Sequence, residues 1–139
     1  MKTTKLVLVG VAAVLGALLA GWLLGASAKR PAERALQTAT LQNDLLASRG
    51  SVLAARVDLY NINFGEASRH LEEARGRLRP AAAQLKGLGR PDDVARIDRA
   101  LSLIEEAQRM AGKLDQGANS RAADALKAID EVRQIDDRR

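Results

Sequence analysis

The most reactive side chains in this 139-residue chain lie around its one histidine. His70 follows Glu66 by four residues and precedes Glu73 by three, and side chains at these spacings share one face of a helix. Such a face can bind a metal ion or exchange protons. A di-metal carboxylate bundle, however, needs two Glu-x-x-His pairs and two further glutamates, which one histidine cannot supply. We therefore interpret His70 as a surface or boundary residue and expect no metal or cofactor.

No other combination of residues indicates catalysis. The acidic doublets are adjacent in sequence, and adjacent residues on a helix point in different directions, so none is a ready acid–base pair. The chain has no cysteine, which excludes disulfides and thiolate chemistry. A Ser/His/Asp order and a glycine-rich phosphate loop are also missing. We expect a protein that is not an enzyme.

One polar and aromatic stretch is the best candidate for binding a partner protein. Tyr60, Asn61, Asn63 and Phe64 fall at the turn between two predicted helices and include both aromatic residues outside the N-terminal apolar segment. Exposed Tyr and Asn side chains can form an interaction hot spot. In the alternative interpretation, which we favour from the sequence, Tyr60 and Phe64 close the end of an aliphatic core.

The N-terminal segment predicts a membrane anchor. After the basic start Met1–Lys5, residues 6–28 carry no charge. As a helix they span roughly 34 Å, enough to cross a bilayer core of about 30 Å. A cleaved secretion signal usually has a shorter apolar region, of about 7–15 residues. Cleavage stays open as an alternative, because Ala26-Ser27-Ala28 has the small-x-small form that signal peptidase cuts after.

Small residues recur every four positions within this segment. Ala13, Ala17, Gly21 and Gly25 share one helical face. Faces of this kind let membrane helices approach closely and pair. The pattern predicts a homodimer formed through the membrane helix.

The charged residues indicate where the protein lies and which kinds of partner it is expected to bind. Basic residues flank the apolar segment on both sides, so they do not decide its orientation. A short basic tail before a long domain is typical of a signal anchor, which places residues 1–5 in the cytoplasm and residues 29–139 outside the membrane. Most basic residues are arginine, a hint of a GC-rich bacterial genome, so we expect a bacterial inner-membrane protein with a periplasmic domain. A net charge of +5 with three aromatic residues makes nucleic-acid binding unexpected.

Apolar periodicity predicts four helices after the anchor and no strand. We expect them at about residues 31–63, 66–88, 92–114 and 121–135, and Ile62, Leu88 and Leu114 continue the apolar stripes of the first three. Pro80 lies within the second and should kink it, because the apolar stripe keeps its phase across the proline. Asn119 or Ser120 is the expected N-cap of the fourth. The predicted fold is all-α, a transmembrane helix followed by two antiparallel αα-hairpins that close as a four-helix bundle or stack as a short array.

The stretch Asn63–Ala74 resembles the turn and second helix of a tetratricopeptide repeat. Ala67, Leu71 and Ala74 follow an aromatic turn with the small, large, small order of that family. The resemblance covers about residues 51–80, and the second hairpin matches poorly. It implies a tetratricopeptide-like hairpin that serves as a protein-binding scaffold.

Three functions are compatible with these observations. The first is a membrane-anchored, non-enzymatic adaptor whose helical domain binds another envelope protein. The second is a secreted, soluble helical binding protein released after Ala28. The third is a ligand-sensing bundle, which the lack of a second predicted span weakens.

Overall fold

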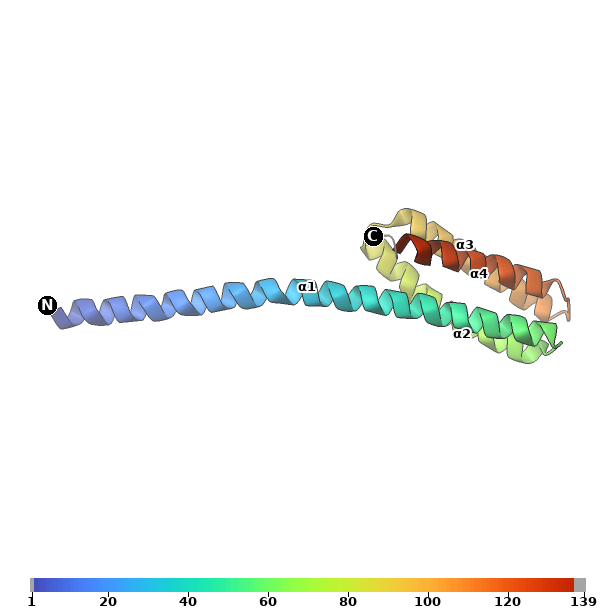
Figure 1. Ribbon diagram of the computed structural model, residues 1–139, viewed down its shortest axis with the longest axis horizontal. Helices are drawn as coiled ribbons and strands as arrows, with labels where there is room; N and C mark the ends of the chain where they lie inside the picture. The colour runs from blue at the N-terminus through green and yellow to red at the C-terminus, as the bar shows by residue number, and fades with distance from the viewer. Residues whose placement is uncertain (1, 137–139) are drawn as a thin grey trace. The chain divides into compact units, whose positions relative to one another are not determined.

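The computed structural model describes the backbone of residues 2–136 and the side-chain surroundings of residues 31–133. Residues 2–136 form four α-helices and no strand, so the all-α prediction is confirmed for this part of the chain (Figure 1). The helices are α1 (Lys2–Tyr60), α2 (Phe64–Gly87), α3 (Pro91–Ala111) and α4 (Ala118–Asp136).

The chain divides into two units, residues 1–38 and residues 39–139, and α1 belongs to both. In the first unit, α1 contains Pro31 in its interior. We expected Pro31 at the start of a separate helix, and this boundary is wrong. Alanine and other good helix formers after Pro31 continue the helix although the proline donates no backbone hydrogen bond.

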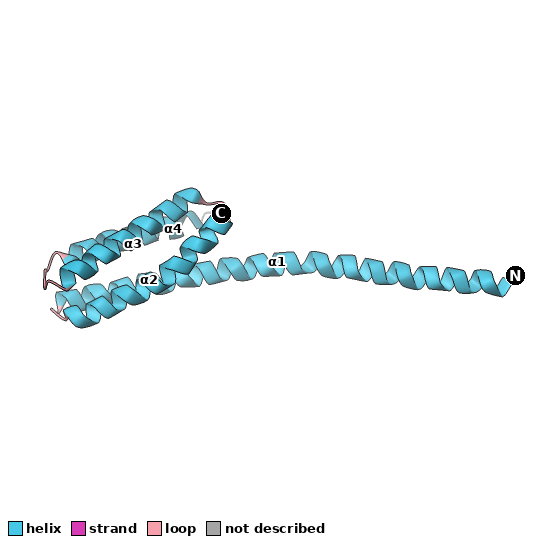
Figure 2. Cartoon of the chain, turned by 180° about the vertical axis from the view of Figure 1, so that it is seen from behind, coloured by secondary structure: helices cyan, strands magenta, loops and turns pink. Residues whose placement is uncertain are grey.

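The second unit is a closed four-helix bundle in which consecutive helices run antiparallel (Figures 1 and 2). A polar contact links every neighbouring pair, including the first and last helices. The contacts are Asp44–Arg77 between α1 and α2 (3.5 Å), Arg75–Glu105 between α2 and α3 (3.0 Å), Glu106–Arg121 between α3 and α4 (3.1 Å) and Arg49–Asp130 between α4 and α1 (2.9 Å). Because α1 and α4 touch, residues 39–136 form a bundle.

The core follows a heptad repeat in each helix. In α2, alanine and leucine alternate at a three-four spacing, with every one of these side chains buried: Ala67, Leu71, Ala74, Leu78, Ala81 and Leu85. The repeat resembles a coiled-coil seam, in which apolar positions three and four residues apart face the neighbouring helices. Eleven of the 22 buried hydrophobic residues in the described chain are alanine, so the helices can approach closely while leucine, isoleucine and valine fill the space between them.

Helix α2 continues through a proline, and α1 continues through a glycine. Pro80 lies inside α2, which continues from Phe64 to Gly87 and bends along its course (Figure 2). The predicted kink without a break is therefore observed. Gly50 is exposed within α1, and the helix passes through it without interruption.

No helix among the described residues combines the length and apolar character needed to cross a membrane. The predicted span Leu6–Ala28, and with it the small-residue face at Ala13, Ala17, Gly21 and Gly25, lies outside the residues whose side chains the structure describes.

The sequence misplaces three residues at the ends of helices. Ile62, Leu88 and Leu114 continue the apolar stripes in sequence, so we expected each to join the core. All three are exposed, because α1, α2 and α3 end at Tyr60, Gly87 and Ala111, before the stripe reaches them. Once a helix ends, its periodicity no longer sets where the next side chain points.

Candidate interaction surface

Helices α1, α2 and α3 end in the same backbone motif. Two or three residues past each helix, one residue has a positive φ: Ile62 (61°), Gly89 (67°) and Leu114 (59°). At the end of α1, Ile62 donates its N–H to the Leu59 carbonyl (3.2 Å) and Asn63 donates to Asp58 (2.8 Å). The same pair of bonds recurs after α2 and α3. This is the Schellman arrangement, which satisfies carbonyls that the helix leaves unpaired.

Two of these three positions carry side chains that the conformation disfavours. A left-handed residue usually is glycine, because a Cβ there approaches the following carbonyl at a cost of roughly 1–2 kcal/mol. Gly89 satisfies this preference, whereas Ile62 and Leu114 do not. Core packing does not offset the cost, because the isoleucine is 64% exposed and the leucine 70% exposed.

Both disfavoured residues lie at the same end of the bundle. The α1–α2 turn and the α3–α4 loop are neighbours there, and the α2–α3 turn lies at the opposite end (Figures 1 and 2). Tyr60, at the last turn of α1, is 82% exposed and adds a third large apolar side chain. We call this end the turn surface and define it as Tyr60, Asn61, Ile62, Asn63 and Leu114.

The structure separates the four residues predicted as a binding site. Tyr60, Asn61 and Asn63 are exposed on the turn surface, and Asn63 does not use its side chain to cap α2. Phe64 is half-buried and packs against the core. The interpretation that the turn aromatics close the core is therefore right for Phe64 and wrong for Tyr60.

The loop beside Leu114 is held by short-range contacts. The Asp115 carboxylate accepts a hydrogen bond from the Gly117 N–H (2.8 Å), so the aspartate organises the start of α4. We expected Asn119 or Ser120 in that role. Asn119 instead accepts a hydrogen bond from Arg56 of α1 (3.0 Å), which ties α4 to α1 near the turn surface. A Cβ at Gly117 would lie 2.6 Å from the terminal methyl of Met110, so a larger residue there would require that flexible side chain to move.

His70 joins α2 to α1. Its Nδ1 lies 3.1 Å from a Glu73 carboxylate oxygen, and its Nε2 lies 3.5 Å from Asp58 and 3.2 Å from Arg69. Both ring nitrogens therefore have polar partners within reach. This is the boundary position expected from the sequence. Among the described residues, no three His, Cys, Asp or Glu side chains are arranged to hold a metal ion.

An exposed ion network covers the start of α2. Arg69 donates to Glu66 (2.8 Å) and also to Glu73. The hydrogen bond and the positive charge of Arg69 lower the pKa of Glu66 below its ordinary value. Glu66 in turn raises the pKa of Arg69. All of these groups are open to solvent, so the network contributes little to stability.

The opposite end of the bundle contains a buried ion network. The Asp93 side chain, 4% exposed, accepts hydrogen bonds from Arg90 (2.6 Å) and Arg96 (3.0 Å). Asp93 also lies in the first turn of α3, where the helix dipole favours a negative charge. The network connects the α2–α3 turn to α3, and its role is structural.

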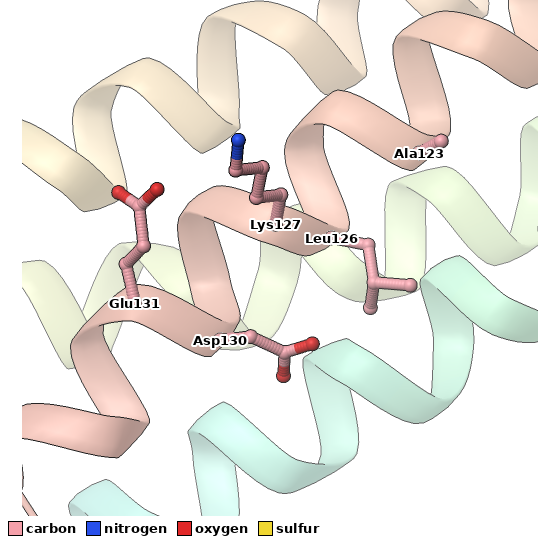
Figure 3. A pocket seen from close by; sticks show the side chains of 5 residues that line it. All are labelled: Ala123, Leu126, Lys127, Asp130 and Glu131. Carbon is pink, nitrogen blue, oxygen red and sulfur yellow. The ribbon is translucent and has the colours of Figure 1, made fainter.

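A shallow hollow on the outer face of α4 is formed by Ala123, Leu126, Lys127, Asp130 and Glu131 (Figure 3). Leu126 and Asp130 point toward α1, whereas Lys127 and Glu131 point toward α3. Asp130 is engaged by Arg49 (2.9 Å) and Arg133 (3.4 Å). One basic and two acidic side chains on an open helix face are the usual composition of a solvated surface, so the hollow does not define a site.

The sequence pointed to one half of the turn surface and missed the other. Ile62 and Leu114 were assigned to the core, because their spacing matches the stripe of the helix before them. No glycine stands at either left-handed position, so the sequence did not mark Ile62 or Leu114 as lying past a helix end. Comparisons of the chain with protein-family models, with curated proteins and with solved structures yield no match.

Proposed function

We propose that this chain is a membrane-anchored, non-enzymatic adaptor whose helical bundle binds another envelope protein through the turn surface. One observation carries the binding part of the proposal. Ile62 and Leu114 hold bulky apolar side chains in a backbone conformation that favours glycine, and both point them into solvent at one end of the bundle. Strained residues of this kind persist at functional sites, where another requirement outweighs the local cost.

The composition of the turn surface fits a protein partner. Tyr60 supplies a large amphipathic ring, Ile62 and Leu114 supply aliphatic area, and Asn61 and Asn63 supply polar groups at its edge. An apolar centre with a polar rim is the usual anatomy of a protein interface. The tetratricopeptide-like sequence of the first hairpin is compatible with the same role.

The anchor part of the proposal rests on the sequence. Residues 6–28 are uncharged and long enough to cross a bilayer as a helix. The intact mass of the protein from a bacterial host, with carbonate extraction of its membranes, tests it. We expect the full-length mass in the carbonate-resistant fraction. A mass beginning at Lys29 in the soluble fraction would instead support a secreted protein and contradict the anchor.

Site-specific photocrosslinking in whole cells tests the binding. A photoreactive phenylalanine analogue at Tyr60 should give a discrete adduct with one envelope protein. The same analogue at Leu88, which is exposed at the opposite end of the bundle, is the matched control. Equal adducts from both positions, or none from Tyr60, would contradict a partner-binding role for the turn surface.

Substitutions at the strained residues separate binding from folding. Ile62→Gly and Leu114→Gly should reduce the Tyr60 adduct while leaving the bundle at least as stable, because glycine relieves the left-handed strain. Leu88→Ala removes exposed apolar area at the other end and should leave the adduct unchanged. Retention of the full adduct in the double glycine variant would show that these side chains do not bind the partner.

A further inference from the structure

Helix α1 carries a second apolar repeat on the face that points away from the bundle. Asn43, Leu46, Gly50, Leu53 and Val57 follow a three-four-three-four spacing, and none is buried. We call these five residues the outer seam. Leu46 is 52% exposed and Val57 is 60% exposed, so two large aliphatic side chains lie in solvent on one face of one helix. Among α1–α4, the outer faces of the other helices show no comparable repeat in their described residues.

The outer seam is distinct from the core seam of the same helix. The buried residues of α1 from Leu41 to Leu59 point into the bundle. The outer seam is offset from them by two positions, which on a helix of 3.6 residues per turn is a rotation of roughly 200°. Helix α1 therefore has two apolar faces on opposite sides. The core face packs against the other helices of the bundle, and the outer seam faces solvent.

Charge is kept out of the outer seam. None of its five residues is ionisable. The nearest basic residues on the α4 side, Arg49 and Arg56, are turned to α4 by an ion pair with Asp130 (2.9 Å) and a hydrogen bond to Asn119 (3.0 Å). On the other flank lie Ala47 and Ala54. A second helix can therefore approach without bringing like charges together or stripping water from a cation.

We propose that two copies of this chain pair in parallel through the outer seam of α1. The seam is complementary to itself. In a parallel, in-register pair Asn43 meets Asn43, and each side-chain amide offers both a donor and an acceptor to the other. A single asparagine in such a seam is a known device for fixing register and a two-stranded state. Gly50 meets Gly50, and the open space around it lets the two helices come close.

The length of the outer seam explains why an anchor matters to this pairing. Five positions spanning 43–57 form about two heptads, which is short for a coiled coil that associates from solution. The proposal rests in this respect on the proposed function. An anchor in one membrane would orient both copies the same way and raise their effective concentration, without adding a contact to the seam.

Cysteine crosslinking tests the pairing, because the full chain contains no cysteine of its own. Leu46→Cys, in the full-length protein in native membranes, should form a disulfide-linked homodimer on mild oxidation. Ser102→Cys, exposed on the outer face of α3, is the control for random collision. We expect about tenfold more dimer from Leu46→Cys, since facing seam residues meet the distance requirement of a disulfide.

A second substitution tests the seam away from the crosslink. Val57→Glu in the Leu46→Cys background places two carboxylates against each other in a parallel pair and should lower the dimer yield about tenfold. The exposed position leaves the fold intact, which far-ultraviolet circular dichroism verifies. Each of the following overturns the proposal: equal dimer from Leu46→Cys and Ser102→Cys, no effect of Val57→Glu, or a Leu46→Cys adduct with a different protein. Carbonate extraction of the same membranes reports separately on the anchor.

Discussion

The two ends of the bundle solve one backbone problem in opposite ways. At the α2–α3 turn, Gly89 takes the left-handed conformation without strain, and the buried Arg90–Asp93–Arg96 network holds the neighbouring helix start. At the other end, Ile62 and Leu114 take the same conformation with bulky side chains that lie in solvent. The first end is built for stability. The second accepts a local cost of roughly 1–2 kcal/mol per residue, which we attribute to binding.

The largest loss in the free energy of unfolding should follow from removing the buried carboxylate beside the α2–α3 turn. Asp93→Ala removes the buried carboxylate that accepts hydrogen bonds from Arg90 and Arg96, and removing one partner of a buried ion pair costs about 3 kcal/mol or more. We expect that loss in the free energy of unfolding measured by chemical denaturation. Asp92→Ala is the matched control, because Asp92 is the exposed neighbour in the same helical turn. Equal losses from both variants would show that the network does not stabilise this end.

The next effect tests whether the left-handed conformation itself is costly. Gly89→Ala should lower the free energy of unfolding by about 1–2 kcal/mol, because it adds a Cβ at a positive φ. Gly87→Ala, at the last residue of α2, should raise it by about 0.5 kcal/mol, because alanine favours a helix. Nothing lies within 4 Å of a Cβ at either position, so only backbone conformation distinguishes them. Changes of the same sign would contradict this explanation.

The same cost can be measured at the turn surface with two variants, Ile62→Gly and Leu114→Gly. Each should raise the free energy of unfolding by about 0.5–1 kcal/mol, since relief of strain exceeds the added freedom of the unfolded chain. Thermal and chemical denaturation of the two variants measure this. A destabilisation above about 1 kcal/mol would mean that these side chains pack in the folded protein, and the contrast between the two ends would fail.

The smallest effect concerns the exposed ion network beside the turn surface. Arg69 lowers the pKa of Glu66, so the ionised carboxylate favours the folded state above the ordinary pKa of 4.5. That contribution is lost as the pH falls through the lower pKa of the folded protein. Glu66→Gln should therefore lower the melting temperature slightly at pH 7 and by less at pH 3. A difference of equal size at both pH values would contradict this account.

The helical fold could be predicted from the sequence because the apolar spacing repeats without interruption. Leu71, Leu78 and Leu85 lie seven residues apart with alanines between them, and no other regular structure buries that pattern on one face. The kink at Pro80 followed in the same way, from a stripe that keeps its phase. These features depend on neighbours within two turns of helix, which the sequence contains directly.

The turn surface depends on contacts that spacing does not encode. Tyr60, Asn61 and Asn63 could be proposed as exposed from their position in a turn, but Ile62 and Leu114 carry the periodicity of core residues. The backbone hydrogen bonds that end α1 and α3 turn both side chains outward, and antiparallel packing brings the two helix ends together. The arginine partners of Asp93, by contrast, lie three residues away on either side, a spacing that the sequence contains directly.

The sequence by itself determined that residues 39–136 form helices and which stripe of each helix is apolar, because both properties arise from local spacing and local propensity. Only the tertiary structure decided that α4 closes against α1 through Arg49 and Asp130, and that α1 keeps a second apolar face without a partner in the described chain. The spacing of apolar residues in the sequence is the same whether a core, a second copy or solvent surrounds them. Which of these surrounds them depends on where the other helices lie.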